Sequence, residues 1–174
     1  MDNLTLFFLA FGLSNKNPFL DQLMIFGAEY VIYITLALMF ILAFKSGTKE
    51  KKAFLLAIFS LPVVVILIKI IHLFIFEPRP FLTFDISPII AHDTSSSFPS
   101  RHASLMAAFA LAYIIYKPRW GLVFLLLMLW VGVARIYVGV HYPLDILGGV
   151  IVGFLSVLLT RQMIKILKGR LMLR

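Results

Sequence analysis

Long apolar runs alternate along the chain with short polar stretches. A helix needs about 20 mostly apolar residues to cross a bilayer. Five segments have this character, although the third is short. The pattern therefore predicts five transmembrane helices, at 24–44, 53–76, 102–117, 119–137 and 143–164.

The first apolar segment, residues 4–13 (LTLFFLAFGL), is too short to cross a membrane. It lacks the basic start and the small-residue cleavage site of a signal peptide. We expect a short helix that lies at the membrane interface or inserts halfway. The expected fold is an all-α polytopic membrane protein, with a single domain over residues 1–174.

The basic residues predict the orientation, because Lys and Arg normally mark the cytoplasmic side. In the five-span arrangement, most of them fall on one face. This basic face holds Lys45, Lys49, Lys51, Lys52, Lys117, Arg119, Arg161, Lys165, Lys168, Arg170 and Arg174. We therefore expect a protein of the cell (plasma or inner) membrane, with a cytoplasmic C-terminus. The N-terminus and segments 77–101 and 135–142 would face outward.

Composition supports this class. The 174 residues are 61% hydrophobic and 14% charged, which is far from the balance of a soluble domain. In a soluble protein, a net charge of +8 would suggest that the protein binds nucleic acid. Here the expected partner is the lipid bilayer, and we expect no nucleic-acid partner. The absence of cysteine excludes disulfides, thiol catalysis and thiolate metal sites.

Three polar clusters stand at the predicted outer ends of spans. They are far apart in the chain, but the topology would bring them to one membrane face. Their candidate site residues are Arg79 in the first, Ser100, Arg101 and His102 in the second, and Arg135, His141 and Asp145 in the third.

These residue types suit phosphate chemistry. Arginines carry forked donors for phosphate oxygens, and helix N-termini that point outward favour an anion. Ser100 precedes the third span as an N-cap residue. Asp145 follows His141 by four residues, so its carboxylate can hold one ring nitrogen and leave the other to attack. His102 would protonate the leaving oxygen.

In order and spacing, these clusters resemble the three-part signature of the type-2 phosphatidic acid phosphatase superfamily, which includes the vanadium haloperoxidases. The match extends over residues 72–145. The positions that match the superfamily signature are Arg79-Pro80, Pro99-Ser100 with His102, and Arg135 with His141 and Asp145.

Within the superfamily, the chain is similar to the small bacterial undecaprenyl-diphosphate phosphatases of the bacitracin-resistance type. This finer resemblance rests on the stretch Phe-Glu-Pro-Arg-Pro-Phe at 76–81, the ending His-Tyr-Pro-Leu-Asp at 141–145 and the entry segment 17–30.

The resemblance implies hydrolysis of a lipid phosphate or diphosphate, with no metal and no cofactor. Its outward site fits the conversion of undecaprenyl diphosphate to undecaprenyl phosphate. His141 would form a phosphohistidine, Asp145 would orient it, and His102 would protonate the leaving group. The residues expected to hold the phosphoryl oxygens are Arg79, Ser100, Arg101 and Arg135.

Three positions depart from the superfamily signature. His72 replaces its lysine, Arg101 replaces its glycine, and Ala134 replaces its serine. Arg101 adds a cation, whereas His72 puts one phosphate contact in question. Lys69, one turn deeper on the same helix face, could supply that contact.

Other functions stay open at this stage. A phosphatase for phosphatidate or phosphatidylglycerophosphate would meet similar phosphates on apolar tails. A non-catalytic lipid-binding or transport subunit would keep the helices without the chemistry. The oligomeric state is not indicated by the sequence.

The sequence also predicts three structural features. Charges inside a span are costly, so we expect Glu29 and Lys69 to form a buried ion pair. We expect His92 and Asp93, in the long loop between the second and third spans, to be simply solvated. Small residues predict close helix packing in the fifth span, at Gly148, Gly149 and Gly153.

Overall fold

The computed structural model describes residues 2–45 and 47–172, and within them it contains helices and no strand. The all-α prediction is confirmed. The helices are α1 (Asn3–Phe11), α2 (Pro18–Glu29), α3 (Val31–Lys45), α4 (Thr48–His72), α5 (Pro80–Thr83), α6 (Arg101–Tyr116), α7 (Pro118–Tyr137) and α8 (Pro143–Met172).

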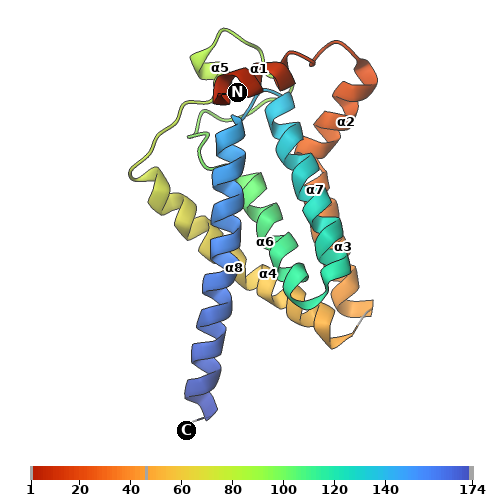
Figure 1. Cartoon of the computed structure of the whole chain (residues 1–174), viewed down its shortest axis with the longest axis vertical. Coiled ribbons are helices and arrows are strands. Elements are labelled where there is room, and N and C mark those ends of the chain that lie inside the picture. The colour runs from red at the N-terminus through yellow and green to blue at the C-terminus, as the bar shows by residue number, and fades with distance from the viewer. Residues whose placement is uncertain (1, 46, 173–174) are drawn as a thin grey trace.

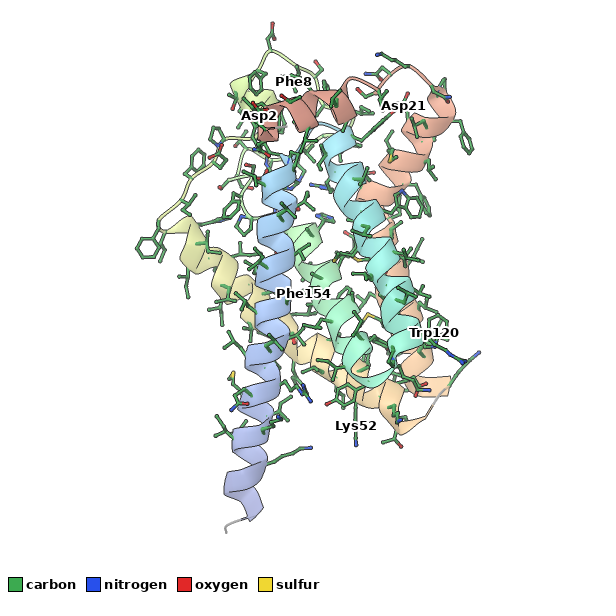
Figure 2. The ribbon with its side chains drawn as sticks, viewed as in Figure 1. Asp2, Phe8, Asp21, Lys52, Trp120 and Phe154 are labelled. Carbon is green, nitrogen blue, oxygen red and sulfur yellow. The ribbon has the colours of Figure 1, made fainter. Side chains whose placement is uncertain are left out.

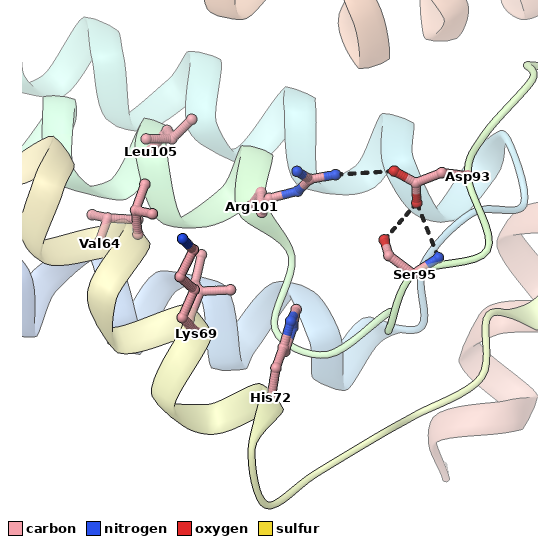
Figure 3. Close-up of a pocket in the computed structure, with 9 residues that line it drawn as sticks. Val64, Lys69, His72, Asp93, Ser95, Arg101 and Leu105 are labelled. Atoms are coloured by element: carbon pink, nitrogen blue, oxygen red, sulfur yellow. Dashed lines mark hydrogen bonds and ion pairs between the residues drawn. The ribbon is translucent and has the colours of Figure 1, made fainter.

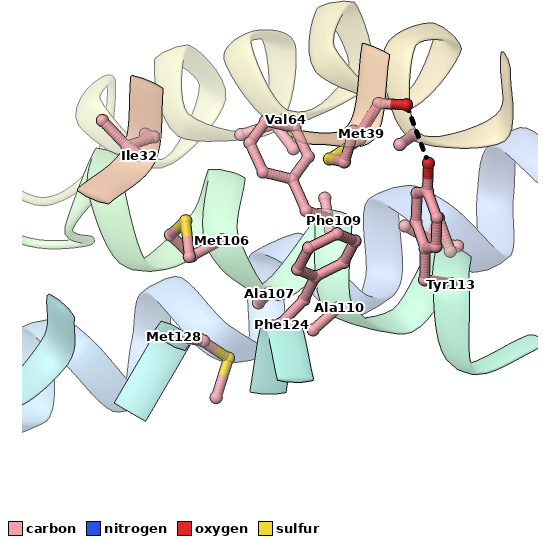
Figure 4. Packing of buried hydrophobic residues seen from close by; sticks show 14 of the residues in the cluster. Ile32, Met39, Val64, Met106, Ala107, Phe109, Ala110, Tyr113, Phe124 and Met128 are labelled. Atoms are coloured by element: carbon pink, nitrogen blue, oxygen red, sulfur yellow. Dashed lines mark hydrogen bonds between the residues drawn. The ribbon is translucent and has the colours of Figure 1, made fainter. Parts of the chain in front are cut away.

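Helix α6 lies at the centre of the bundle, where it packs against α4, α7 and α8 (Figure 1). Its side chains form much of the core, with Met106, Phe109 and Tyr113 all buried (Figure 4). Phe124 of α7 packs edge-on against the Tyr113 ring, and the Tyr113 hydroxyl donates to the Met39 carbonyl over 3.2 Å. The shortest of the predicted spans is therefore the most enclosed one.

Three helices, α4, α7 and α8, are long and apolar enough to cross a membrane. Helices α2 and α3 pass the same test only as a pair, bent by 54°. The prediction of one helix over 24–44 is therefore wrong, because the chain breaks at Tyr30 between the two. Helix α2 begins earlier, at Pro18, where the Asn17 side chain accepts from two backbone N–H groups.

The remaining boundaries lie close to their predictions, except at α4 and α8. Helix α4 begins at Thr48, before the predicted start at 53, and ends at His72, so residues 73–79 form a turn and an irregular connection rather than the end of a span. Helix α8 continues to Met172, well beyond the predicted end at 164. The N-terminal segment forms α1, which lies across one end of the bundle against α7 and α8. Figure 2 shows Asp2 and Phe8 at this end, and Lys52 and Trp120 toward the opposite one.

The predicted Glu29–Lys69 ion pair is wrong. No ion pair joins these side chains within the part of the chain that the structure describes. The physical reason is the packing of α2, which lies mainly against α7 and α3, whereas Lys69 belongs to α4. Lys69 faces a pocket beside α6 instead.

Close packing between α6 and α8 is confirmed at the predicted glycines. A Cβ atom on Gly153 would lie 2.2 Å from the Ser104 carbonyl oxygen, and one on Gly149 would lie 2.6 Å from that of Ser100. A Cβ atom on Gly148 would meet the Phe98 ring at 2.3 Å. At Gly149 and Gly153 the backbones therefore approach too closely for a side chain, and at Gly148 the Phe98 ring occupies the space.

We expect Gly153→Ala to destabilise the protein by about 1–3 kcal/mol, because the added methyl group overpacks against a backbone carbonyl that cannot rotate away. The measurement is the thermal unfolding midpoint of the purified protein in detergent. Leu155→Ala, at an exposed position of the same helix, is the control. Equal midpoints for both variants would contradict the close α6–α8 contact.

Candidate active site

His141 and Asp145 lie together at the start of α8. The imidazole Nδ1 of His141 is 3.3 Å from Oδ2 of Asp145, and both side chains are buried. The same carboxylate oxygen accepts from the Tyr142 backbone N–H over 2.8 Å. The Asp145 carbonyl in turn accepts from the Ser100 N–H over 3.0 Å, which ties the start of α8 to the start of α6. Nε2 of His141 is thereby left to face the neighbouring arginines.

Arg79, just before α5, connects three segments. Its Nη1 donates to the Val140 carbonyl over 3.0 Å and lies 3.4 Å from Nε2 of His141. Its Nη2 donates to the Ser95 hydroxyl over 3.1 Å. The Arg79 side chain is 2% exposed, so a full positive charge is held next to the free face of His141.

Arg135 reaches the same place from the last turn of α7. Its Nη1 donates to the Ala28 carbonyl over 3.5 Å, at the end of α2 where the broken span bends. Its Nη2 lies 2.6 Å from Nε2 of His92. This side chain is also 2% exposed.

Several buried polar atoms here have no hydrogen-bond partner among the described residues. They are the Nε atoms of Arg79 and Arg135, the hydroxyls of Ser97 and Ser100, and Nε2 of His72. Buried polar groups are nearly always paired, and donors that converge without partners suit an anion. Ser100 is the N-cap residue of α6, as its position predicts, but its hydroxyl makes no cap bond.

A small cavity of about 10 Å³, close to the size of one water molecule, lies between His141 and the arginines. Most of the predicted site residues therefore meet at one point, although the chain separates them by up to 69 positions. The cavity is lined by His72, Arg79, His92, Ser96, Pro99, Arg101, His102, Arg135 and His141.

A larger pocket of about 300 Å³ adjoins this cavity on the α4 side (Figure 3). His72 and Arg101 line both spaces, whereas Lys69 lines only the larger one. The other walls of this larger pocket are of two kinds. Apolar side chains of α4 and α6 form one wall, and polar side chains of the 93–95 loop form the other. The pocket therefore has the two-sided character of a site for an amphiphile.

The expectation that His92 and Asp93 are simply solvated is wrong. His92 contacts Arg135, and the Asp93 carboxylate lies 3.4 Å from Arg79 and 3.2 Å from Arg101. The length of the 77–100 connection was the available signal, since long connections in compact proteins are commonly functional. Sequence spacing could not show which of its residues fold back onto the arginines.

Helix α1 covers the loop that carries His141. The Phe7 ring is fully buried and packs against Tyr142, with ring centroids 5.4 Å apart. The Asn3 side chain accepts from the Leu144 N–H over 3.0 Å, at the start of α8. Gly139 adopts a φ of +85°, and a Cβ there would lie 2.8 Å from the Phe11 ring. The N-terminal helix thus fixes the position of the backbone around His141.

The PAP2 superfamily matches residues 51–168 of this chain. The chain belongs to the PAP2 superfamily. It is 32% identical to undecaprenyl-diphosphatase BcrC of Bacillus subtilis over 157 residues, which cover 88% of this chain and 81% of that protein. Membership confirms the resemblance found in the motifs and, with it, the expected class of enzyme, a lipid phosphatase.

Two solved structures share the fold. The crystal structure of Aquifex aeolicus LpxE superposes with a TM-score of 0.72 at 24% identity, over 92% of this chain and 94% of that one. The transmembrane PAP2 type phosphatidylglycerolphosphate phosphatase from Bacillus subtilis gives 0.63 at 24% identity, over 94% and 84%. At this identity the likeness concerns the fold alone, which is that of membrane PAP2 proteins.

Burial and the charges of the neighbouring arginines favour the neutral form of His141. Burial, and after it the positive charges of Arg135 and Arg79, lower the pKa of His141 well below its ordinary value of 6.5. Burial also lowers the pKa of His92, and the positive charges of Arg79 and Arg135 lower it further. Hydrogen bonds from Ser95 hold the pKa of Asp93 well below its usual range, so that carboxylate is charged.

We expect the His141 ring to remain unprotonated as the pH falls through 6.5, because a lowered pKa moves protonation to more acidic solutions. The measurement is an NMR titration of the imidazole signals, with His141→Ala to assign them. Arg135→Gln should move the midpoint upward, since it removes one of the nearby positive charges. A wild-type midpoint at or above 6.5 would contradict this electrostatic account.

Proposed function

We propose that this PAP2 phosphatase hydrolyses undecaprenyl diphosphate to undecaprenyl phosphate and inorganic phosphate at the outer face of the cell membrane. The observation that carries the proposal is His141, backed by Asp145 and facing a cavity lined by Arg79 and Arg135. The name of the Bacillus subtilis relative, undecaprenyl-diphosphatase, supports the choice of lipid.

The first chemical step would be an attack by Nε2 of His141 on the terminal phosphorus. A bond forms between Nε2 and phosphorus, and the bond from phosphorus to the bridging oxygen breaks. Asp145 holds Nδ1 and stabilises the charge that develops on the ring. His102, on the cavity wall, gives its proton to the departing undecaprenyl phosphate.

The second step would release the enzyme. Water attacks the phosphohistidine, the now neutral His102 accepts a proton from it, and inorganic phosphate leaves with His141 restored. Positioning and charge stabilisation dominate phosphoryl transfer, so the donors around the phosphoryl group supply much of the rate. We assign this role to Arg79, Ser100, Arg101 and Arg135.

The adjoining pocket suits the rest of the lipid. Its polar wall, with Lys69 and His72, lies next to the cavity, and its apolar wall includes Val64 and Leu105. A diphosphate on an isoprenoid chain has the same order of polar and apolar parts. His72 and Lys69 are therefore accessory contacts in this proposal, outside the phosphoryl-transfer chemistry itself.

The proposed topology has five crossings in one domain. Four are α4, α7, α8 and the bent α2–α3 pair. The fifth is α6, whose 16 residues give about 24 Å of helix, which is shorter than a typical span, and which packs against the longer helices α4, α7 and α8. With basic loops in the cytoplasm, His141 and the loop before α6 face outward.

We expect purified protein in detergent to release phosphate from undecaprenyl diphosphate in the presence of EDTA, because histidine supplies the nucleophile. His141→Ala should lower kcat at least about 10³-fold, and Asp145→Asn less, since the second change leaves the nucleophile in place. The measurement is phosphate release from undecaprenyl diphosphate, phosphatidate and phosphatidylglycerophosphate, assayed side by side.

The matched control is Asp85→Asn, an exposed residue of the loop before α6 that forms no ion pair with any described residue. It should retain wild-type turnover. Faster release from phosphatidate or phosphatidylglycerophosphate would replace the proposed substrate. Equal release by wild type and His141→Ala would remove the catalytic assignment altogether.

A further inference from the structure

The Asp93 carboxylate bridges two arginines of the proposed phosphate site. Its Oδ1 lies 3.4 Å from Nη2 of Arg79, and its Oδ2 lies 3.2 Å from Nη2 of Arg101. Figure 3 shows the Arg101 contact beside the pocket that Lys69 and His72 line. Arginine binds phosphate oxygens through the same N–H groups. The carboxylate therefore lies where a phosphoryl oxygen would bind.

Ser95 holds Asp93 in this orientation. The Ser95 N–H donates to Oδ1 of Asp93 over 3.2 Å, and the Ser95 hydroxyl donates to the same oxygen. That hydroxyl also accepts from Nη2 of Arg79 over 3.1 Å. Hydrogen bonds within the loop therefore fix the position of the Asp93 carboxylate, so its contact with the arginines does not depend on the conformation of a single free side chain.

The arginines need a negative partner. Arg79 is almost fully buried, Arg101 and Arg135 lie nearby, and a buried cation without a counter-charge is strongly destabilising. Among the described residues, Asp93 is the carboxylate within ion-pair distance of Arg79 and Arg101, whereas Asp145 is paired with His141. The Asp93 side chain is 55% exposed, so it can exchange these arginines for water without unpacking the core.

We propose that Asp93 is an internal counter-anion that the phosphate of the substrate must displace, and that it thereby selects headgroups by their charge. This inference rests on the proposed phosphate-binding role of Arg79 and Arg101. A phosphoryl group and the carboxylate compete for the same two guanidinium nitrogens, and both are negative, so they do not bind together. Binding is an exchange.

Exchange favours the more highly charged anion. A terminal phosphate carries about two negative charges near neutral pH, whereas a carboxylate or a phosphodiester carries one. Phosphodiester headgroups surround any site at the membrane interface, and an uncompensated arginine cluster would bind them. Displacing Asp93 therefore raises the Kd of every anion by a similar factor. Singly charged anions bind the arginines more weakly, so this cost leaves them largely unbound, whereas the terminal phosphate of a monoester or diphosphate still displaces the carboxylate.

The test measures anion binding rather than turnover, so it does not depend on which lipid is hydrolysed. Inorganic phosphate and dimethyl phosphate, a singly charged phosphodiester, are titrated separately into the purified full chain in detergent by isothermal calorimetry. Asp93→Asn removes the charge and keeps an oxygen for the Ser95 hydrogen bonds. It should lower the Kd for inorganic phosphate about 3- to 10-fold, and that for dimethyl phosphate at least as much.

Two controls isolate the charge. Asp93→Glu keeps it, and its Kd values should stay within about 2-fold of wild type. Asp85→Asn removes an exposed charge from the same loop without touching an arginine, and it should change neither Kd. Unchanged or weaker phosphate binding by Asp93→Asn would overturn the proposal.

A further variant covers the case in which Asp93→Asn does not fold. Ser95→Ala releases the carboxylate from its hydroxyl partner and should tighten phosphate binding about 2-fold, whereas unchanged or weaker binding would overturn the proposal. Tighter phosphate binding by a protein that hydrolyses none of the lipids would support the displacement of Asp93 and contradict only the proposed function.

Discussion

Two buried arginines determine how the end of the bundle that carries His141 is built. Arg79 and Arg135 are each about 2% exposed, and charges at that depth must be met by oppositely polarised groups. The partners come from three separate places: the end of α2, the loop before α6, which carries the Asp93 carboxylate, and the turn before α8. Connections that have little secondary structure of their own are therefore held in place by cations.

The apolar bundle gives these connections a rigid base. Glycines of α8 bring its backbone against that of α6, and the two helix starts are joined by the bond from the Ser100 N–H to the Asp145 carbonyl. His102 on one helix and Asp145 on the other are thereby fixed relative to each other. Helix α1 adds a cover over the His141 loop through Phe7, which is fully buried. Rigid elements of this kind suit phosphoryl transfer, where positioning supplies much of the rate.

Much of the site could be predicted because its residues follow helix geometry and a recurrent spacing. His141 and Asp145, four residues apart at a helix start, lie as that spacing requires. Other features could not be predicted. The predicted Glu29–Lys69 ion pair was wrong because two residues at a similar depth in the membrane can belong to helices that do not contact each other. The prediction of one continuous helix over 24–44 was wrong at Tyr30, where hydropathy continues but the helix breaks.

The sequence alone determined the membrane class, the helical fold, the family and the residue types that gather at one face, since hydropathy and motif spacing are local properties of the chain. The tertiary structure decided which polar groups meet. His92 and Asp93 reach the arginines only because the loop before α6 folds back onto them, and nothing in their spacing encodes that path. Such contacts form because buried arginines need negatively charged or polar partners, and the arginines become buried only when the chain has folded.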